Sequence, residues 1–253
     1  VMSHGVDRTP KGTEVLKPGE ELTVSRFLAV GASPLDAVGI AGLRRGGVIT
    51  AGVFLHDDKG NPATTAALLV EVEPGKTLVG YPDDSGAVAL ALPAGTYSWS
   101  AEDQGRETIT GTIKLEEGVE PVRQEVKMGP QSVVIFSIKD DKGKLLPCKV
   151  QFSGREGTKN PNLGPQNRAH GCRDQWHSER GDFRVPLAAG KYRVTVTRGI
   201  EYSHYVKEID LAQGEKVAVK GTLRRLVDTK GWVSTDYHNH STPSGDNTCG
   251  TKD

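Results

Sequence analysis

Three residues near the end of the sequence have the types and the spacing of a metal site. Asp236, His238 and His240 alternate with other residues in WVSTDYHNH, which spans 232–240. In a strand, alternate side chains share one face about 7 Å apart, so both imidazoles can reach one divalent cation. A helix would need a spacing of four residues for the same task, so the pattern predicts a strand. Asp236 is then placed to hydrogen-bond a ligand histidine or to touch the metal.

Other groups that could do chemistry have simpler explanations. His170, Cys172 and His177 could hold zinc with a fourth partner, but their Gly- and Asn-rich surroundings also fit a solvent-facing loop. Three acidic pairs stand at 57–58, 83–84 and 140–141. These pairs lack the ordered oxygen spacing and the terminal Glu of a calcium loop, so they predict hairpin turns. Ser241 is not part of a G-x-S-x-G elbow, so the sequence does not support serine hydrolysis.

The two histidines belong to a longer string, D-x-H-x-H-S-x-x-S-x-D, which runs from Asp236 to Asp246. This string resembles the first motif of the PHP (polymerase and histidinol phosphatase) metallohydrolase superfamily, whose fold is a distorted (β/α)7 barrel. The lead-in, RGIEYSHY at 198–205 and LRRLVDTKGW at 223–232, is similar to that of carbaryl-hydrolase-like members. The resemblance to the catalytic family covers residues 226–253.

The resemblance implies roles for individual residues. His238 and His240 become metal ligands at the end of the first barrel strand, at the face where barrel active sites gather. Asp246 corresponds to the acidic ligand that follows the histidines in many members, although Gly245 shifts it by one position and a turn residue fits equally well. Two or three divalent ions (zinc, manganese or iron) would hold a bridging water and polarise the ester under attack.

The length of the chain bears on the enzyme prediction. In this family further His, Asp and Glu ligands come from later strands, and such a barrel needs on the order of 200 residues. About 13 residues follow His240. The resemblance therefore predicts a PHP-type metal-dependent hydrolase for the parent protein, and an incomplete catalytic set without activity for this chain alone. Glu201 and Tyr202 of the lead-in would either pack on the barrel or take ordinary strand positions.

The rest of the sequence must position this motif, and its pattern is that of β-strands. Apolar and polar residues alternate, as in ITGTIKL and KYRVTVT, and turn signals recur roughly every 8–12 residues. GAVALALPAGTY at 86–97 returns as GDFRVPLAAGKY at 181–192, and DDKG occurs at 57–60 and again at 140–143. This internal repeat predicts two similar domains. The unequal separation of the two pairs predicts an insertion at 154–178 in the second copy.

The repeated pattern resembles the carboxypeptidase regulatory-like family of small immunoglobulin-like sandwiches. Gly95 and Gly190 permit a tight turn, and the tyrosines that follow, Tyr97 and Tyr192, would place their rings in the core between two sheets. The fold class is therefore predicted as all-β, with tandem immunoglobulin-like sandwiches followed by the first strand of a truncated PHP barrel.

Four segments make up the predicted domain plan, and none of them contains the pattern of a long amphipathic helix. Residues 1–45 would be the last strands of a preceding β domain, and 226–253 would begin an incomplete barrel domain. The two sandwiches would span 46–128 and 129–225.

Composition narrows the range of partners. Lys and Arg number 32, as do Asp and Glu, so no surplus of cations favours a nucleic-acid surface. The longest apolar run, at 87–94, is far shorter than the roughly 20 residues of a membrane span. The cysteines are odd in number; Cys148 and Cys172 could pair, and Cys249 would then remain.

Two functions remain open. In the first, the sandwiches are the accessory region of a metal-dependent hydrolase that acts on a small phosphoester, carboxyl ester or carbamate. In the second, the chain is a non-enzymatic tandem immunoglobulin-like module that binds a glycan, a wall component or a protein partner. Tandem sandwiches often decorate exported proteins, which favours a periplasmic or secreted location.

Overall fold

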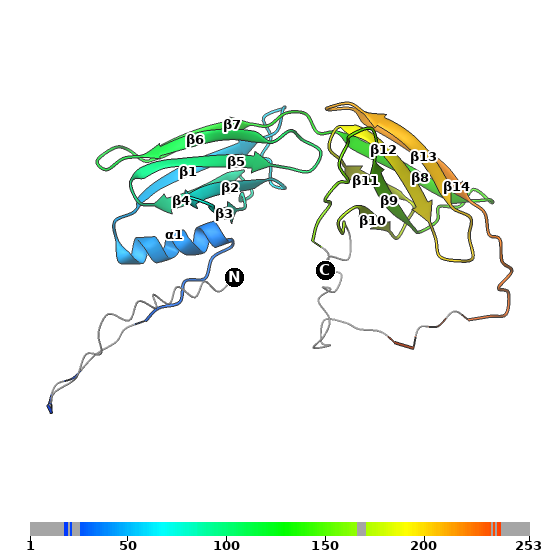
Figure 1. Ribbon diagram of the computed structural model, residues 1–253, viewed down its shortest axis with the longest axis horizontal. Coiled ribbons are helices and arrows are strands. Elements are labelled where there is room, and N and C mark those ends of the chain that lie inside the picture. Colours follow the sequence, from blue (N-terminus) through cyan, green and yellow to red (C-terminus); the bar gives the residue numbers. More distant parts are fainter. Residues whose placement is uncertain are drawn as a thin grey trace. The chain divides into compact units, whose positions relative to one another are not determined.

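The computed structural model describes residues 18–19, 21, 26–165, 171–233, 235 and 237–238, and it confirms an all-β fold built from tandem sandwiches (Figure 1). The chain divides into two compact units. The first comprises Val1–Glu102 and Thr108–Met128, and the second comprises Asp103–Glu107 and Gly129–Asp253.

Seven of the described strands form the first sandwich. They are β1 (Ile49–His56), β2 (Ala67–Glu73), β3 (Lys76–Gly80), β4 (Ala87–Leu92), β5 (Gly95–Glu102), β6 (Ile109–Leu115) and β7 (Val122–Lys127). One sheet has the order β4-β1-β7 and the other the order β3-β2-β5-β6. β1 pairs with β7 in parallel, whereas its ladder with β4 is antiparallel. Alternate side chains of β1 and β2, such as Val53 and Leu68, are buried between the sheets, as the period of a strand requires.

The second sandwich repeats the first strand for strand. Its strands are β8 (Val133–Asp140), β9 (Cys148–Gly154), β10 (Gln175–Ser178), β11 (Asp182–Pro186), β12 (Gly190–Thr197), β13 (Tyr205–Leu211) and β14 (Lys216–Leu223). The sheet orders are β11-β8-β14 and β10-β9-β12-β13, and β8 pairs with β14 in parallel. These orders confirm the internal repeat. The copies differ between their second and third strands, where 74–75 link β2 to β3 but 155–174 link β9 to β10.

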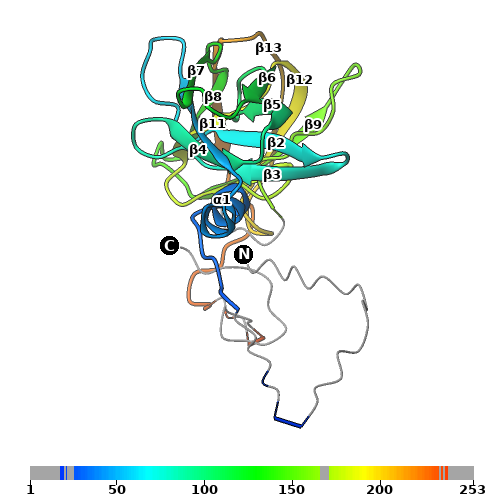
Figure 2. The same ribbon diagram turned by 90° about the vertical axis from the view of Figure 1, so that its left-hand side faces the viewer.

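Helix α1 (Pro34–Arg45) corrects the prediction that residues 1–45 are the last strands of an earlier β domain. The Ser33 hydroxyl accepts a hydrogen bond from the Asp36 amide (3.1 Å), and the Asp36 carboxylate accepts one from the Ala32 amide (2.8 Å). These two bonds satisfy amides that the start of a helix leaves without partners. The helix lies beside β3 and β4, and Leu35 enters the core of the first sandwich (Figures 1 and 2).

Gly86 and Gly181 close corresponding turns, just before β4 and β11. Their φ values are 82° and 88°, in the left-handed region that favours glycine. A Cβ atom would lie 2.4 Å from the Leu55 carbonyl oxygen in the first copy and 2.4 Å from the Leu146 carbonyl oxygen in the second. The repeated glycine is therefore required by the close approach of two backbone segments.

Tyr97 and Tyr192 confirm the role predicted for the repeated G-x-Y. Each hydroxyl donates to a carbonyl oxygen four residues upstream, Tyr97 to Pro93 (2.9 Å) and Tyr192 to Ala188 (3.0 Å). The Tyr192 ring is buried, and the Tyr97 ring is partly buried against its core. Burial raises the pKa of both phenols above the ordinary value, so both are neutral donors at physiological pH.

Candidate functional site

The predicted metal motif lies at the margin of the described residues. His238 is described, whereas Asp236, His240 and Asp246 lie outside the described part of the chain. His238 is exposed and its backbone is not in a strand. The described positions from 231 to 237 are not in a strand either, which differs from the strand predicted for 232–240. A strand needs a neighbour for its N–H and C=O groups, and no described strand pairs with these positions.

The geometry of the candidate ligand set is therefore not established. Among the described residues, no three His, Cys, Asp or Glu side chains gather in a group that could hold a metal ion. The roles of Asp236, His238, His240 and Asp246 stay predictions from the sequence.

The backbone that leads to this motif is held against the second sandwich. The loop after β12 and the segment after β14 (orange in Figure 1) pair through hydrogen bonds that backbone amides donate. The Ser203 amide donates to the Arg224 carbonyl oxygen (2.8 Å), and the Arg224 amide donates to the Ser203 hydroxyl (2.9 Å). The Leu226 amide donates to the Glu201 carbonyl oxygen (2.8 Å). The chain beyond β14 is therefore fixed to the sandwich for several residues.

Side chains reinforce the same junction. The Arg225 guanidinium donates to the Glu201 carboxylate (2.7 Å) and to the Thr229 hydroxyl, which donates in turn to Glu201 (3.3 Å). The guanidinium carbons of Arg198 and Arg225 lie 5.5 and 5.8 Å from the centre of the Tyr202 ring, within cation–π range. The hydrogen bond that Arg225 donates to the Glu201 carboxylate raises the pKa of Arg225 above its ordinary value. We call these five residues the exit clamp.

The exit clamp gives Glu201 and Tyr202 a role that the sequence left open. The loop that carries them holds the start of the segment that ends in the predicted metal motif. Sequence reasoning missed the pairing of Glu201 with Arg225 because these residues are 24 positions apart and meet through the paths of β13 and β14.

Several large apolar side chains around the exit clamp are exposed. They are Ile200, Leu226, Val227, Trp232, Val233 and Tyr237. Single exposed apolar residues are common on protein surfaces, whereas a contiguous patch of them would mark a surface that another body covers.

A second candidate site lies on the insertion between β9 and β10, of which 166–170 are not described. The Arg155 amide donates to the Lys191 carbonyl oxygen (2.9 Å), and the Thr158 hydroxyl accepts from the Lys191 amide (3.0 Å). The Asn160 side-chain oxygen accepts from the Gly154 amide (2.9 Å). These bonds fix the first half of the insertion against the end of β9 and the start of β12.

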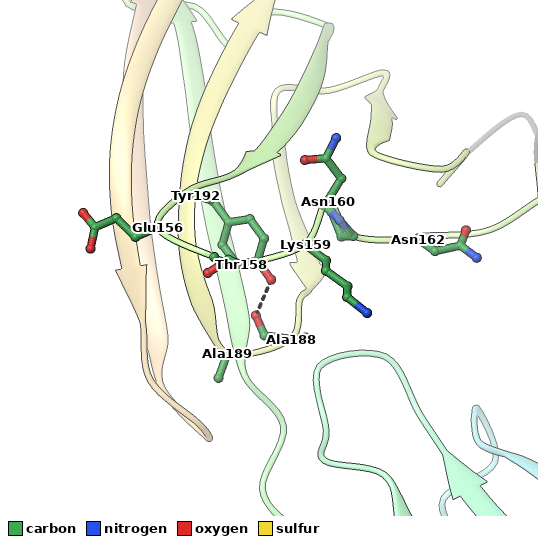
Figure 3. A pocket seen from close by; sticks show the side chains of 10 residues that line it. Glu156, Thr158, Lys159, Asn160, Asn162, Ala188, Ala189 and Tyr192 are labelled. Atoms are coloured by element: carbon green, nitrogen blue, oxygen red, sulfur yellow. Dashed lines mark hydrogen bonds between the residues drawn. The ribbon is translucent and has the colours of Figure 1, made fainter.

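A hollow of about 580 Å³ lies between this loop and the turn before β12 (Figure 3). We call it the loop hollow. Its lining residues are Glu156, Gly157, Thr158, Lys159, Asn160, Pro161, Asn162, Ala188, Ala189 and Tyr192. Lys159 and Asn162 extend from the loop, and the Tyr192 hydroxyl bonds to Ala188 on the other side. The sequence predicted the insertion and offered a zinc group in its second half, at His170, Cys172 and His177, but it did not identify this hollow; the only signal for the hollow was the length of a polar, Gly- and Asn-rich stretch.

The acidic pairs form turns, as the sequence predicted. The Asp57 carboxylate accepts from the Lys59 and Asn61 amides (2.9 and 2.8 Å), and Asp140 makes the same pair of bonds in the second copy. Asp83 accepts from the Ser85 hydroxyl (2.6 Å) and from backbone amides, and these bonds, the hydroxyl first, lower its pKa. Each of these carboxylates is therefore engaged in holding a turn.

Of the described cysteines, Cys148 is a free thiol. Cys148 is buried at the start of β9, and burial raises its pKa to about 11. Cys172 is partly exposed in the insertion, where its backbone bridges to Gln175. The disulfide that the sequence allowed between them is therefore not formed. Of the three residues of the alternative zinc group, His170 lies outside the described residues.

None of the described helices has the length and apolar character needed to cross a membrane. No protein-family model matches the chain, and neither does any curated protein.

Solved structures that are similar to this chain include proteins named as pilins. A *Bacillus anthracis* TIE protein matches 71% of this chain with 16% identity and a TM-score of 0.32, and a streptococcal ancillary pilin matches 71% with 17% identity and a TM-score of 0.36. The E269A mutant of the shaft pilin SpaA from Lactobacillus rhamnosus GG matches 71% with 10% identity and a TM-score of 0.40. The matches span 34%, 62% and 97% of these three chains, respectively.

Proposed function

We propose that the described part of the chain is a non-catalytic tandem immunoglobulin-like module that carries the first metal-binding motif of a metal-dependent hydrolase. The exit clamp is the observation that supports this most directly. It ties the segment after β14 to a rigid sandwich just ahead of Asp236, His238 and His240. A sandwich that fixes the approach to a motif limits where the motif can lie.

Two further observations support a module in which the sandwiches are not catalytic and the segment after them carries the metal-binding motif. The carboxylates of Asp57, Asp83 and Asp140, which could have gathered at a site, accept backbone amides in turns. The exposed apolar side chains beside the exit clamp are suited to packing against the domain that the motif begins.

The donor chemistry of the motif fits the metals that the sequence predicts. Neutral imidazoles and carboxylates suit zinc, manganese and iron. His238 and His240 would bind through ring nitrogens, Asp246 through a carboxylate oxygen, and Asp236 would orient one imidazole. A bound ion would lower the pKa of a water molecule and polarise a phosphoester, carboxyl ester or carbamate.

Metal analysis of the full-length protein tests this proposal. We expect the double variant His238→Ala/His240→Ala to lose bound metal, together with phosphodiesterase or esterase activity. His204→Ala, which removes an exposed imidazole from the same unit, is the matched control and should retain both. Unchanged metal content in the double variant would overturn the proposal.

A second candidate function is the binding of a glycan, a wall component or a protein through the second sandwich, in a periplasmic or secreted setting. The loop hollow favours this candidate, because the described first half of the insertion offers polar groups that the first copy lacks. A glycan and protein-partner screen with residues 26–225 tests it, since helix α1 supplies Leu35 to the first core and must be kept. If this fragment binds a partner and the binding is lost when 155–174 are replaced by Pro-Gly, the result would support this candidate. If the unmodified fragment binds no partner, the result would contradict it.

A further inference from the structure

The first sandwich lacks the insertion, so a comparison of the two copies shows whether the fold needs it. Both copies have the same strands in the same order, yet the first joins its second and third strands through Pro74 and Gly75 alone. The fold therefore does not require the 155–174 connection. Connections of this length without secondary structure are uncommon in compact domains and usually have a function.

The first half of the insertion is held in an unfavourable backbone conformation. Glu156 has a φ of 49°, which costs energy for a residue with a side chain. Its carboxylate pairs with the Lys191 ammonium (2.5 Å), and the bonds of Thr158 and Asn160 hold the loop on both sides. Strain that surrounding contacts maintain is typical of functional sites.

The chemistry of the loop hollow selects a class of ligand. The Glu156 carboxylate pairs with the Lys191 ammonium, which offsets its negative charge. The ammonium of Lys159 also lies in the lining, and within the described residues it forms no ion pair. Asn160 and Asn162 use their side-chain oxygens to accept backbone amides (2.9 and 3.3 Å), which leaves their –NH2 groups as donors. The lining is thus rich in donors around one positive charge.

The lining offers little to an apolar ligand. Its large ring, that of Tyr192, is buried, and its alanines and Pro161 present small surfaces. Ring oxygens, hydroxyls and a carboxylate are the acceptors that amide and ammonium donors match.

From these groups we infer that the loop hollow binds an acidic saccharide, with Lys159 on the carboxylate and Asn162 on sugar oxygens. This inference deepens the binding role proposed as the second candidate function. Asn160 and Thr158 are positioning residues, because their side chains hold the loop in place.

Titration of the 253-residue chain with trigalacturonate tests the inference, with neutral maltotriose as the comparison ligand. We expect saturable heat or amide chemical-shift changes with trigalacturonate and none with maltotriose. Lys159→Gln should weaken binding about tenfold or more, as expected for the loss of a charge-assisted hydrogen bond. Lys142→Gln, at an exposed position in the DDKG turn of the same unit, is the matched control and should bind as the parent chain does.

Three outcomes would overturn the inference: no binding of trigalacturonate, equal affinity in Lys159→Gln, or equally tight binding of a triglutamate peptide. Lys159 is exposed, so its substitution is not expected to unfold the chain, and an unchanged melting temperature confirms this. The chain could fail to bind trigalacturonate and still bind another partner only when 155–174 are present. In that case the saccharide assignment is wrong and the broader binding role stands.

Discussion

The exit clamp depends on one residue, Glu201, which accepts hydrogen bonds through both its side chain and its backbone. Glu201 accepts from Arg225 and Thr229 through its side chain, and its carbonyl oxygen accepts from the Leu226 amide. Because the Arg225–Glu201 pair is partly exposed, its removal should loosen the segment locally without unfolding the sandwich.

We predict that Glu201→Gln accelerates hydrogen exchange of the Leu226 amide about two- to fivefold, with little change in melting temperature. Glu208→Gln removes an exposed ion pair with Arg193 (2.7 Å) and serves as the control. It should leave the Leu226 amide unaffected. Equal exchange in the two variants would show that the Glu201 side chain does not hold the segment.

The Cys148 thiol should be unreactive in the native protein. Burial raises its pKa to about 11, so almost no thiolate is present at pH 8. The Cys172→Ser/Cys249→Ser variant isolates this thiol. We expect it to react with a thiol reagent at pH 8 only after denaturant is added, and rapid labelling of the folded variant would contradict the buried position.

The same thiol makes stability depend on alkaline pH. The pKa is raised in the folded state, so the thiol contributes stability that is fully present below the ordinary value of 9.0 and is lost as pH rises through about 11. In the Cys172→Ser/Cys249→Ser variant, the free energy of unfolding should fall more steeply between pH 8 and 11 than in the same variant with Cys148 also replaced by Ala. Denaturant titrations at several pH values in this range give the comparison.

Among the elements, helix α1 places its most deeply buried large side chain, that of Leu35, in the core of the first sandwich. Leu35 is 1% exposed and belongs to the core cluster, whereas Leu43 on the same helix is 56% exposed. We predict that Leu35→Ala lowers the free energy of unfolding of the first sandwich by about 2–5 kcal/mol. Leu43→Ala should change it by less than about 0.5 kcal/mol. Chemical denaturation of both variants gives the comparison, and similar values would mean that the helix does not pack as described.

The sequence predicted the strands well because apolar and polar residues alternate along a strand that buries one face. Helix α1 was missed although Ser33, Pro34 and Asp36 form a capping sequence. Its two glycines, Gly39 and Gly42, are poor helix formers and hid the pattern. The structure explains Gly42, because a Cβ there would lie 2.7 Å from a Val48 methyl carbon, whereas a Cβ at Gly39 would make an ordinary contact with the Ala91 Cβ (3.4 Å). Close packing at Gly42 is a constraint that a local sequence pattern does not reveal.

The candidate sites were predictable to different degrees. The type and spacing of Asp236, His238 and His240 were sufficient to suggest metal chemistry. The exit clamp and the loop hollow were not predictable, because both depend on residues that only the folded chain brings together. Glu156 and Lys191, for example, are 35 positions apart and meet because β12 pairs beside β9.

At the scale of the whole molecule, the repeat allows the same substitution to be compared in two copies. Tyr97 and Tyr192 make the same hydrogen bond, but only Tyr192 is buried. We predict that Tyr192→Phe lowers the free energy of unfolding of its sandwich by about 1–1.5 kcal/mol, because a partly buried hydrogen bond to the Ala188 carbonyl oxygen is lost. Tyr97→Phe should cost less, since water can replace the hydroxyl. A larger cost at Tyr97, measured by denaturation, would contradict this reasoning.

The parallel ladders have a mechanical consequence. β1 pairs with β7, and β8 with β14, so in each sandwich the first and last strands point the same way and the chain enters at one end and leaves at the other. A pulling force applied across either sandwich would act along the ladder in shear. The hydrogen bonds between β8 and β14, from Val133 to Asp140, would then bear the force together, rather than breaking one after another.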